Sequence, residues 1–400
     1  MTRRSFINLV LPFIPFPAVA ARPKLKLTRL ELLPVRATER TVWLFIRLHT
    51  DAGLVGLGEA SDAFGFSNTS KQDVARIESQ LRSFFQLMEG HSPFDIEVFR
   101  SKARSTAQQG SVMIATAFSA IEQALWDLAG KALGVPVYTL LGGSTRNSLP
   151  VYANINRTTK PRTPEGFAST AKRAVAEGFR AIKAAPFDGF PPKSATDQRI
   201  REAVELGIAC TRAIRDAVGP DVQVMIDCHS HFTVAMSQQV ASQLEPVNLA
   251  WYEEPVPPKQ VAATLEVKRS IRQPMAGGEM LFGVEGFLPL CAQRAVDVIM
   301  PDVKHCGGVL EMKLIAAMAA GHQVAVAPHN PAGPISTAAS VQICAGMPNF
   351  QILELQWGEV PWRGDLLAPR ETFVKGEIAV PDAPGFGVSL NDTLLRSKLF

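Results

Sequence analysis

Short apolar runs alternate with amphipathic stretches over residues 149–355. The runs are typical of strands buried on both faces, and the stretches between them repeat apolar residues every three or four positions, as amphipathic helices do. Six runs lead to an acidic residue or a histidine at steps of 23 to 27 residues, namely Asp227, Glu253, Glu279, Asp302, His329 and Glu354. One strand–helix unit of a (β/α)8 barrel takes about 25 residues. The pattern therefore predicts an α/β barrel with eight parallel strands.

A different pattern precedes the barrel. Over residues 25–148, two β-rich runs and a hairpin turn at Asp51–Gly53 come before three segments with helical spacing. This order predicts an α+β domain made of an antiparallel sheet and a helical bundle. The last segment, residues 356–400, is short and rich in proline, and we expect it to pack back on this first domain.

The barrel pattern places three carboxylates side by side. The C-terminal ends of the strands share one mouth, where sites on this fold are built. Asp227, Glu253 and Glu279 end successive strands, and three neighbouring carboxylates repel one another unless a cation lies between them. Oxygen ligands favour a hard divalent ion, most simply one Mg²⁺ per subunit. Glu253 keeps the 26-residue step on both sides, so we expect its neighbour Glu254 to hold a nearby cationic group instead.

These motifs resemble the enolase superfamily, in particular its mandelate racemase-like branch and, within it, the galactonate and mannonate dehydratase group. The resemblance rests on Asp227-Cys228-His229, Glu253-Glu254-Pro255, Gly278-Glu279, Pro301-Asp302 with Gly307-Gly308, and Pro328-His329-Asn330. It implies a modified TIM barrel of the (β/α)7β type with an N-terminal α+β capping domain. An early loop of that domain closes over the barrel mouth in the family, which makes Ser61–Ser70 a candidate lid, although an ordinary solvated hairpin loop fits the same residues. The family also implies a homo-oligomer.

Two histidines are the candidate proton-transfer groups. His329 is the expected base, because Asp302 ends the preceding strand and can accept the imidazole N–H, which fixes the tautomer. The resemblance places a His–Asp dyad at these positions and implies that His229 is the general acid that protonates a departing β-hydroxyl. A structural histidine at position 329 and a polar loop residue at position 229 are the alternatives.

The second barrel strand lacks one residue that the racemase-like branch often has. That branch often carries Lys-X-Lys, with the second lysine as a base opposite the histidine, but here the sequence is Lys183-Ala184-Ala185. The missing base favours elimination over a two-base racemase or epimerase. Lys183 itself could bind the substrate carboxylate or tune the local field.

The resemblance also suggests how the substrate is held. Glu354 matches a family position that contacts the carboxylate or the intermediate through hydrogen bonding. Asn154, Asn156 and His231 lie at or just beyond strand ends and could bind substrate hydroxyl groups, although exposed polar loop residues look the same in a sequence.

The leading hypothesis is a Mg²⁺-dependent acid-sugar dehydratase. Such an enzyme removes the proton α to a carboxylate through a metal-stabilised enediolate and eliminates the 3-hydroxyl, which gives a 2-keto-3-deoxy sugar acid. One alternative is a racemase, epimerase or other lyase that acts on another carboxylate. Another is a non-catalytic, exported sugar-acid binder that retains the metal.

Composition and charge fit a small-molecule partner. The chain is 46% hydrophobic and 20% charged, which is enough for a large core, and its net charge of +4 comes without a long basic run. Nucleic-acid or membrane-surface binding therefore has little support, and we expect a small carboxylate as the substrate.

The N-terminus resembles a twin-arginine export signal. Thr2-Arg3-Arg4-Ser5-Phe6 precedes an apolar run and the small residues Ala18–Ala21, with a plausible cut after Ala20. The run is too short and too rich in proline for a good membrane span. We therefore expect residues 1–20 to direct export to the periplasm, with a cytoplasmic protein as the alternative. The five scattered cysteines are expected to be buried free thiols.

Overall fold

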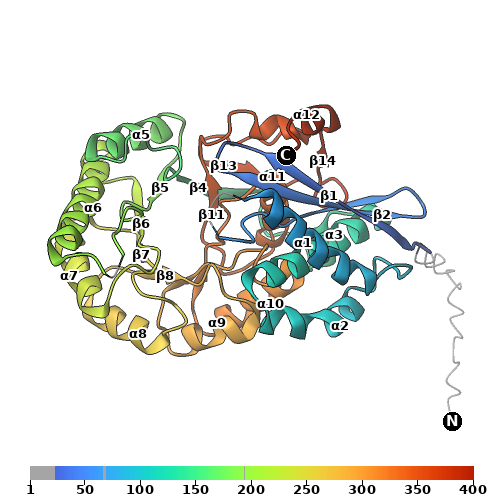
Figure 1. Cartoon of the computed structure of the whole chain (residues 1–400), viewed down its shortest axis with the longest axis horizontal. Coiled ribbons are helices and arrows are strands. Elements are labelled where there is room, and N and C mark those ends of the chain that lie inside the picture. Colours follow the sequence, from blue (N-terminus) through green and yellow to red (C-terminus); the bar gives the residue numbers. More distant parts are fainter. Residues whose placement is uncertain (1–22, 66–68, 193) are drawn as a thin grey trace, which may run out of the picture.

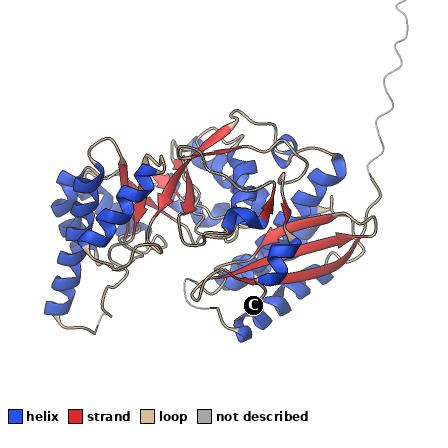
Figure 2. Ribbon diagram, turned by 90° about the horizontal axis from the view of Figure 1, so that it is seen from above, coloured by secondary structure: helices blue, strands red, loops and turns tan. Residues whose placement is uncertain are grey.

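The computed structural model describes residues 23–65, 69–192 and 194–400. A ring of strands surrounded by helices lies beside a second unit, in which three antiparallel strands pack on helices (Figure 1, Figure 2). The predicted export segment, residues 1–20, lies outside the described residues, and so do residues 66–68 of the predicted lid loop.

In the part of the chain that the structure describes, eight parallel strands form the barrel. They are β4 (Ser148–Asn154), β5 (Ala181–Ala184), β6 (Gln223–Asp227), β7 (Trp251–Glu253), β8 (Met275–Gly277), β9 (Val298–Ile299), β10 (Ala325–Val326) and β11 (Leu353–Gln356). Neighbours in sequence pair, β11 pairs with β4, and a parallel bridge from Val326 to Phe350 closes the ring. The connecting helices are α5 (Pro164–Ala176), α6 (Asp197–Val218), α7 (Val234–Leu244), α8 (Val261–Ser270), α9 (Gly283–Ala292), α10 (Gly308–Gly321) and α11 (Pro334–Cys344), with a 3-10 turn η1 (Glu245–Val247). The predicted (β/α)7β barrel is confirmed.

Apolar side chains fill the barrel interior, so it is a packed core and not a pore. Tyr152 and Trp251 are fully buried and pack edge to face, with ring centroids 5.5 Å apart. Met225 and Met300 belong to the same cluster. The indole Nε1 of Trp251 donates a hydrogen bond of 2.8 Å to Glu253 Oε2, so this core orients a side chain of the site.

The N-terminal unit is an antiparallel sheet packed on helices, as the sequence pattern predicts. Its elements are β1 (Leu27–Arg36), β2 (Val42–Thr50), β3 (Val55–Glu59), α1 (Lys71–Gln86), α2 (Ile96–Gln109), α3 (Val112–Leu133) and the short α4 (Val137–Leu140). Strand β3 lies so close to α3 that a Cβ on Gly56 or Gly58 would come within 2.3 Å of a helix carbonyl oxygen. By length and composition α3 could cross a membrane, but 78% of the relevant window is buried, as in the core helix of a globular domain.

The C-terminal segment returns to this first sheet. It contains η2 (Arg363–Leu366), β12 (Leu367–Ala368), β13 (Glu377–Ala379), β14 (Ser389–Leu390) and α12 (Asp392–Ser397). Leu366 and Leu395 pack in one cluster with Val35 and Trp43, and the final N–H of the chain donates to the carbonyl of Pro34 over 2.9 Å. Strand β13 also pairs with β4, so the segment links both units.

Buried carboxylates join the N-terminal unit to the barrel helices. Glu59 accepts hydrogen bonds from the N–H groups of Gly333 and Ser336, at 2.6 and 2.8 Å, and so caps the start of α11. Glu122 accepts from the N–H groups of Val309 and Leu310, at 2.6 and 3.0 Å, at the start of α10. These contacts fix the N-terminal unit against the barrel segments that follow β9 and β10, which carry residues of the site.

Candidate active site

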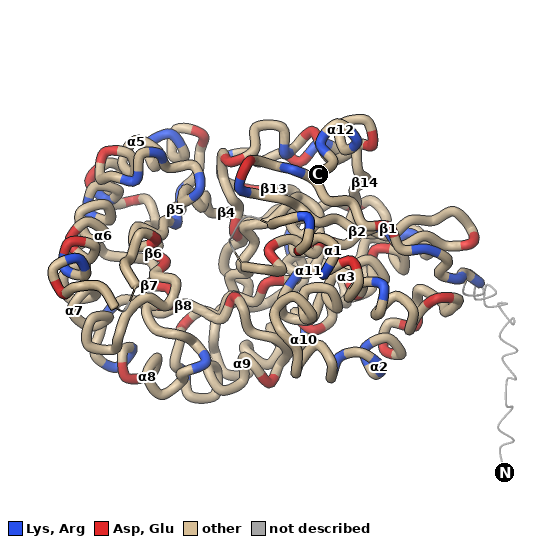
Figure 3. The backbone as a smooth tube through the Cα atoms, in the orientation of Figure 1, with Lys and Arg blue, Asp and Glu red and all other residues tan. Residues whose placement is uncertain are grey.

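The three predicted metal-binding carboxylates meet at the barrel mouth. Asp227 and Glu253 are the last residues of β6 and β7 and are paired in register, while Glu279 lies two residues beyond β8. All three are buried, and each offers a carboxylate oxygen within 4.8 Å of the others. Figure 3 shows acidic positions gathered inside the ring at these strands. The barrel thus brings together residues that are 26 positions apart in sequence.

The cluster has the properties of a site for a hard cation. Burial raises the pKa of Glu253 well above its ordinary value, and repulsion from Asp227 is the next largest cause of this rise. Burial also raises the pKa of Glu279, and Glu279 Oε2 accepts no hydrogen bond from any residue that the structure describes. A divalent cation among these oxygens would keep the three groups ionised and would give Oε2 a second contact besides the ring of His329, whose Nε2 lies 3.2 Å away. A donor set made only of oxygen suits such an ion.

The ammonium group of Lys183 lies beside the cluster and is fully buried. Its Nζ is 2.8 Å from Glu253 Oε1, 3.1 Å from Glu354 Oε1 and 3.8 Å from Asp227 Oδ2. Burial by itself lowers the pKa of Lys183, but these carboxylates outweigh burial and raise it well above its ordinary value. Lys183 therefore remains a cation and holds Glu253 and Glu354 in place.

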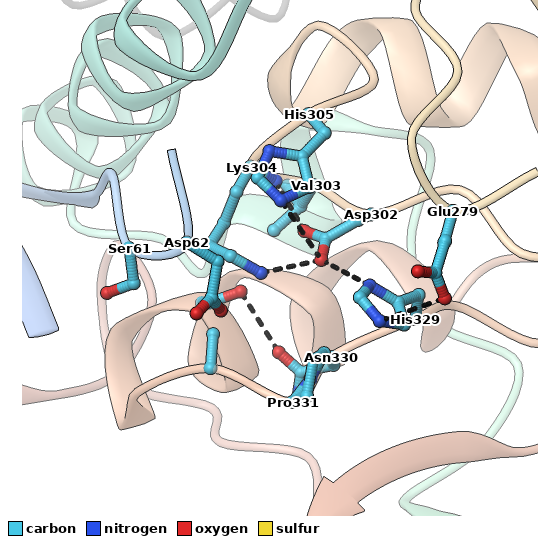
Figure 4. Close-up of polar contacts among 12 residues, drawn as sticks. Ser61, Asp62, Glu279, Asp302, Val303, Lys304, His305, His329, Asn330 and Pro331 are labelled. Atoms are coloured by element: carbon cyan, nitrogen blue, oxygen red, sulfur yellow. Dashed lines mark hydrogen bonds and ion pairs between the residues drawn. The ribbon is translucent and has the colours of Figure 1, made fainter. Parts of the chain in front are cut away.

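His329 lies between two carboxylates, as Figure 4 shows. Its Nδ1 is 2.8 Å from Asp302 Oδ2 and its Nε2 is 3.2 Å from Glu279 Oε2. Burial lowers the pKa of His329, whereas Glu279, Glu354 and the bond to Asp302 raise it, and the net change is upward. With Nδ1 bonded to Asp302, Nε2 is the ring nitrogen that faces the cluster.

A lysine that the sequence analysis did not select completes this dyad. Lys304 is fully buried, its Nζ lies 2.5 Å from Asp302 Oδ2, and its N–H donates to Asp302 Oδ1 over 2.8 Å (Figure 4). Burial raises the pKa of Asp302, but Lys304 and the nearby histidines His305 and His329 lower it to well below its ordinary value. Asp302 is therefore a firmly ionised partner for His329.

His229 reaches the cluster from another side. Its Nε2 lies 3.0 Å from Asp227 Oδ2 and its Nδ1 lies 2.5 Å from Asp188 Oδ1. Its backbone turns sharply, with φ of +43°, and its N–H donates to Asp227 Oδ1 over 2.9 Å. Burial lowers the pKa of His229, but Asp227 and Asp188 raise it well above its ordinary value. Asp188 was not selected from the sequence, because it lies in a loop outside the strand-end period.

The cluster opens into a cavity of about 680 Å³. Asn154, Asn156 and His231, the predicted substrate-binding residues, line it together with Arg40, Arg157, Arg162 and Gln356. Two of these side chains donate hydrogen bonds to carboxylates. Asn154 Nδ2 donates to Glu354 Oε1 over 2.7 Å, and Asn156 Nδ2 donates to Asp188 Oδ2 over 2.6 Å. His231 stacks on Phe190, with ring centroids 5.5 Å apart.

Glu254 also lines the cavity, but its surroundings differ from our expectation. Its hydrogen bonds come from neutral donors, the N–H of Gly278 at 2.8 Å and the hydroxyl of Ser230 at 3.3 Å, where we expected a cationic group. A positive φ of +38° at Glu254 turns the chain sharply after Glu253. Consecutive residues on a strand point to opposite faces. The turn at Glu254 departs from this strand geometry and so determines where the Glu254 carboxylate lies. The sequence alone does not reveal this turn.

Family models cover nearly all of the described chain. The model for the N-terminal domain of mandelate racemase and muconate lactonizing enzyme matches residues 26–142, and the enolase C-terminal domain-like model matches residues 166–394.

Relatives and solved structures agree with these matches. A D-xylonate dehydratase of Haloferax volcanii is 34% identical over 358 residues, which is 87% of this chain and 83% of the relative. A D-galactonate dehydratase of Ralstonia pickettii is 30% identical over 94% of this chain and 95% of its own. The crystal structure of a mandelate racemase/muconate lactonizing enzyme from Jannaschia sp. CCS1 has a TM-score of 0.83 at 30% identity, and the match covers 94% of this chain and 98% of the other. The chain therefore belongs to the mandelate racemase and muconate lactonizing enzyme branch of the enolase superfamily.

Proposed function

We propose that the protein is a Mg²⁺-dependent acid-sugar dehydratase. It removes the proton α to the carboxylate of a sugar acid and expels the 3-hydroxyl, and the product is a 2-keto-3-deoxy acid. The first support is the names of its relatives, which are dehydratases of D-xylonate, D-gluconate and D-galactonate. These three compounds are hydroxylated monocarboxylates, and we assign this class of substrate to the chain.

The observation that carries the proposal is a pair of imidazoles that contact different carboxylates of one cluster. His329 Nε2 lies 3.2 Å from Glu279 Oε2, and His229 Nε2 lies 3.0 Å from Asp227 Oδ2. A substrate bound at the cluster would therefore meet one imidazole near Glu279 and the other near Asp227. Elimination of water needs one group that takes a proton and another that gives one, which matches two separate imidazoles.

His329 is assigned the role of base. Its Nδ1–H donates to Asp302, so in the neutral form of the ring the lone pair of Nε2 faces the cluster and is available to the α-proton. Asp302 then stabilises the imidazolium that forms, because its carboxylate is held ionised by Lys304.

His229 is assigned the role of acid. It gives the proton from Nε2 to the leaving 3-hydroxyl, which departs as water. The α-proton thus ends on His329, and the proton lost by His229 leaves with the product water. Both histidines return to their starting states by exchange with solvent.

Asp227, Glu253 and Glu279 would hold Mg²⁺, which supplies the positive charge that stabilises the developing enediolate. Lys183 adds a second fixed cation beside the cluster. This is the charge arrangement that proton removal next to a carboxylate requires, because the carbanion form carries a second negative charge.

The proposal is tested with a panel of acid sugars and amino-acid derivatives. Each compound is incubated with the protein in deuterated buffer containing Mg²⁺, and both keto-acid formation and α-proton exchange are recorded. The expected result is keto acid from at least one sugar acid, lost when a chelator removes Mg²⁺ and restored when Mg²⁺ is added back. Exchange without keto acid across the whole panel would instead support a racemase or epimerase, and saturable binding without turnover would support a binding protein.

A further inference from the structure

We propose that Asp188 is the positioning residue for the acid His229, so that the site contains two separate His–Asp pairs, one for each half of the reaction. This inference rests on the proposed dehydration. Asp188 lies between β5 and α6, and its carboxylate enters the site from a loop and not from a strand end.

The two pairs have the same internal geometry. His329 bonds to Asp302 through Nδ1, at 2.8 Å, and presents Nε2 to the cluster. His229 bonds to Asp188 through Nδ1, at 2.5 Å, and likewise presents Nε2 to the cluster. A carboxylate on one ring nitrogen fixes the orientation of the ring and decides which nitrogen reacts. Asp188 therefore fixes the ring orientation of His229 in the same way that Asp302 fixes the ring orientation of His329.

The carboxylate of Asp188 is itself held by residues that follow β4. Asn156 Nδ2 donates to Asp188 Oδ2 over 2.6 Å, and Arg162 Nη2 lies 3.7 Å from the same oxygen. Arg162 is tied in turn to the side-chain oxygen of Asn156 at 2.9 Å and to the carbonyl of Ala185 at 2.6 Å. Oδ1 of Asp188 thus contacts His229, while Oδ2 contacts Asn156 and lies near Arg162.

Aromatic packing fixes the loop on both sides of Asp188. Phe187 is buried and meets Phe232 edge to face, with ring centroids 5.0 Å apart. Phe190 packs against Phe232 at 5.4 Å and stacks on His231. The loop therefore holds the carboxylate at a defined position, and little reorganisation is needed when the acid acts.

The experiment separates the two halves of the reaction. Asp188→Asn is compared with the unmodified protein on the sugar acid that the panel identifies, in deuterated buffer with Mg²⁺. Total α-proton removal is the sum of deuterium in the recovered substrate and of keto acid formed. We expect Asp188→Asn to keep total α-proton removal close to that of the unmodified protein, while keto-acid formation falls about 100-fold, the lower range of what a general acid contributes.

Two further variants sharpen the result. Asp188→Glu keeps a carboxylate and should recover part of the elimination that Asp188→Asn loses. Asp221→Asn changes an exposed aspartate in the turn before β6 and should leave both rates unchanged. Equal losses of proton removal and elimination in Asp188→Asn, or no loss of either, would overturn the inference while leaving the dehydratase proposal intact. If the unmodified protein forms no keto acid from any sugar acid, the proposed function fails, and this inference fails with it.

Discussion

His329 and Lys304 contact the same oxygen of Asp302, with His329 Nδ1 at 2.8 Å and Lys304 Nζ at 2.5 Å. Asp302 Oδ2 therefore contacts both the expected base, His329, and the buried cation Lys304. Because an unpaired buried carboxylate tends to take up a proton, Lys304 keeps Asp302 in the ionised form that can orient and stabilise the imidazole.

Replacement of Lys304 by Met should mainly lower kcat. We expect a loss of about 10-fold to 100-fold, by analogy with the loss seen when a residue that orients a metal ligand is removed. The KM should change little, because Lys304 is fully buried and is not among the described residues that line the cavity. Steady-state kinetics on the identified substrate checks this. Lys304→Arg keeps the charge and should recover part of the activity, and an unchanged kcat in Lys304→Met would show that Asp302 needs no cation.

The adjacent residues Glu253 and Glu254 should differ sharply in Mg²⁺ binding. Glu253→Gln removes a cluster carboxylate and should weaken Mg²⁺ binding by more than about 100-fold in titration calorimetry. Burial and the neighbouring Glu279 raise the pKa of Glu254 to about 8. Glu254 is not one of the three clustered carboxylates, and its oxygens accept hydrogen bonds from the Gly278 N–H and the Ser230 hydroxyl. Glu254→Gln should therefore change the affinity much less. Equal losses in the two variants would argue against Glu253 as the ligand.

Glu122 should stabilise the junction between the N-terminal unit and the barrel. Its two oxygens accept hydrogen bonds from Val309 N–H, Leu310 N–H and Trp126 Nε1–H. In Glu122→Gln the amide nitrogen cannot accept, so at least one buried donor loses its partner, and the free energy of unfolding should fall by about 1–3 kcal/mol.

Urea unfolding of both proteins measures this difference. The matched control is Glu97→Gln, on α2, where the side chain is 74% exposed and a salt bridge contributes little. A loss in the control as large as that in Glu122→Gln would mean that the capping contacts are not the cause.

The periodic part of the site could be predicted, because strand ends in a parallel barrel share one mouth. Asp227, Glu253 and Glu279 lie near the ends of adjacent strands, and regular spacing is enough to place them together. The order of strands and helices followed from the same alternation. Loop and turn positions could not be obtained in this way. Asp188 reaches His229 only through the course of the β5–α6 loop, and Lys304 reaches Asp302 only through a tight turn after β9.

The contacts that join the N-terminal unit to the barrel could not be predicted from the sequence either, because they link residues far apart in the chain. Glu59 and Gly333, and Glu122 and Val309, lie 274 and 187 residues apart in sequence, and no local pattern marks them as partners. Asn156 shows the same limit, since its amide is directed to Asp188 by a contact between two loops. A polar residue beyond a strand end can be recognised in the sequence, but its partner depends on how the loops fold over the mouth.

The most direct measurement of the central claim is α-proton removal in deuterated buffer by His329→Asn and His229→Asn, with keto acid recorded in the same samples. The account predicts that His329→Asn abolishes both proton removal and keto-acid formation, because the base is gone. His229→Asn should still exchange the α-proton of the substrate but form little keto acid, because only the acid is gone. Persistent α-proton exchange in His329→Asn would contradict the assignment of His329 as the base.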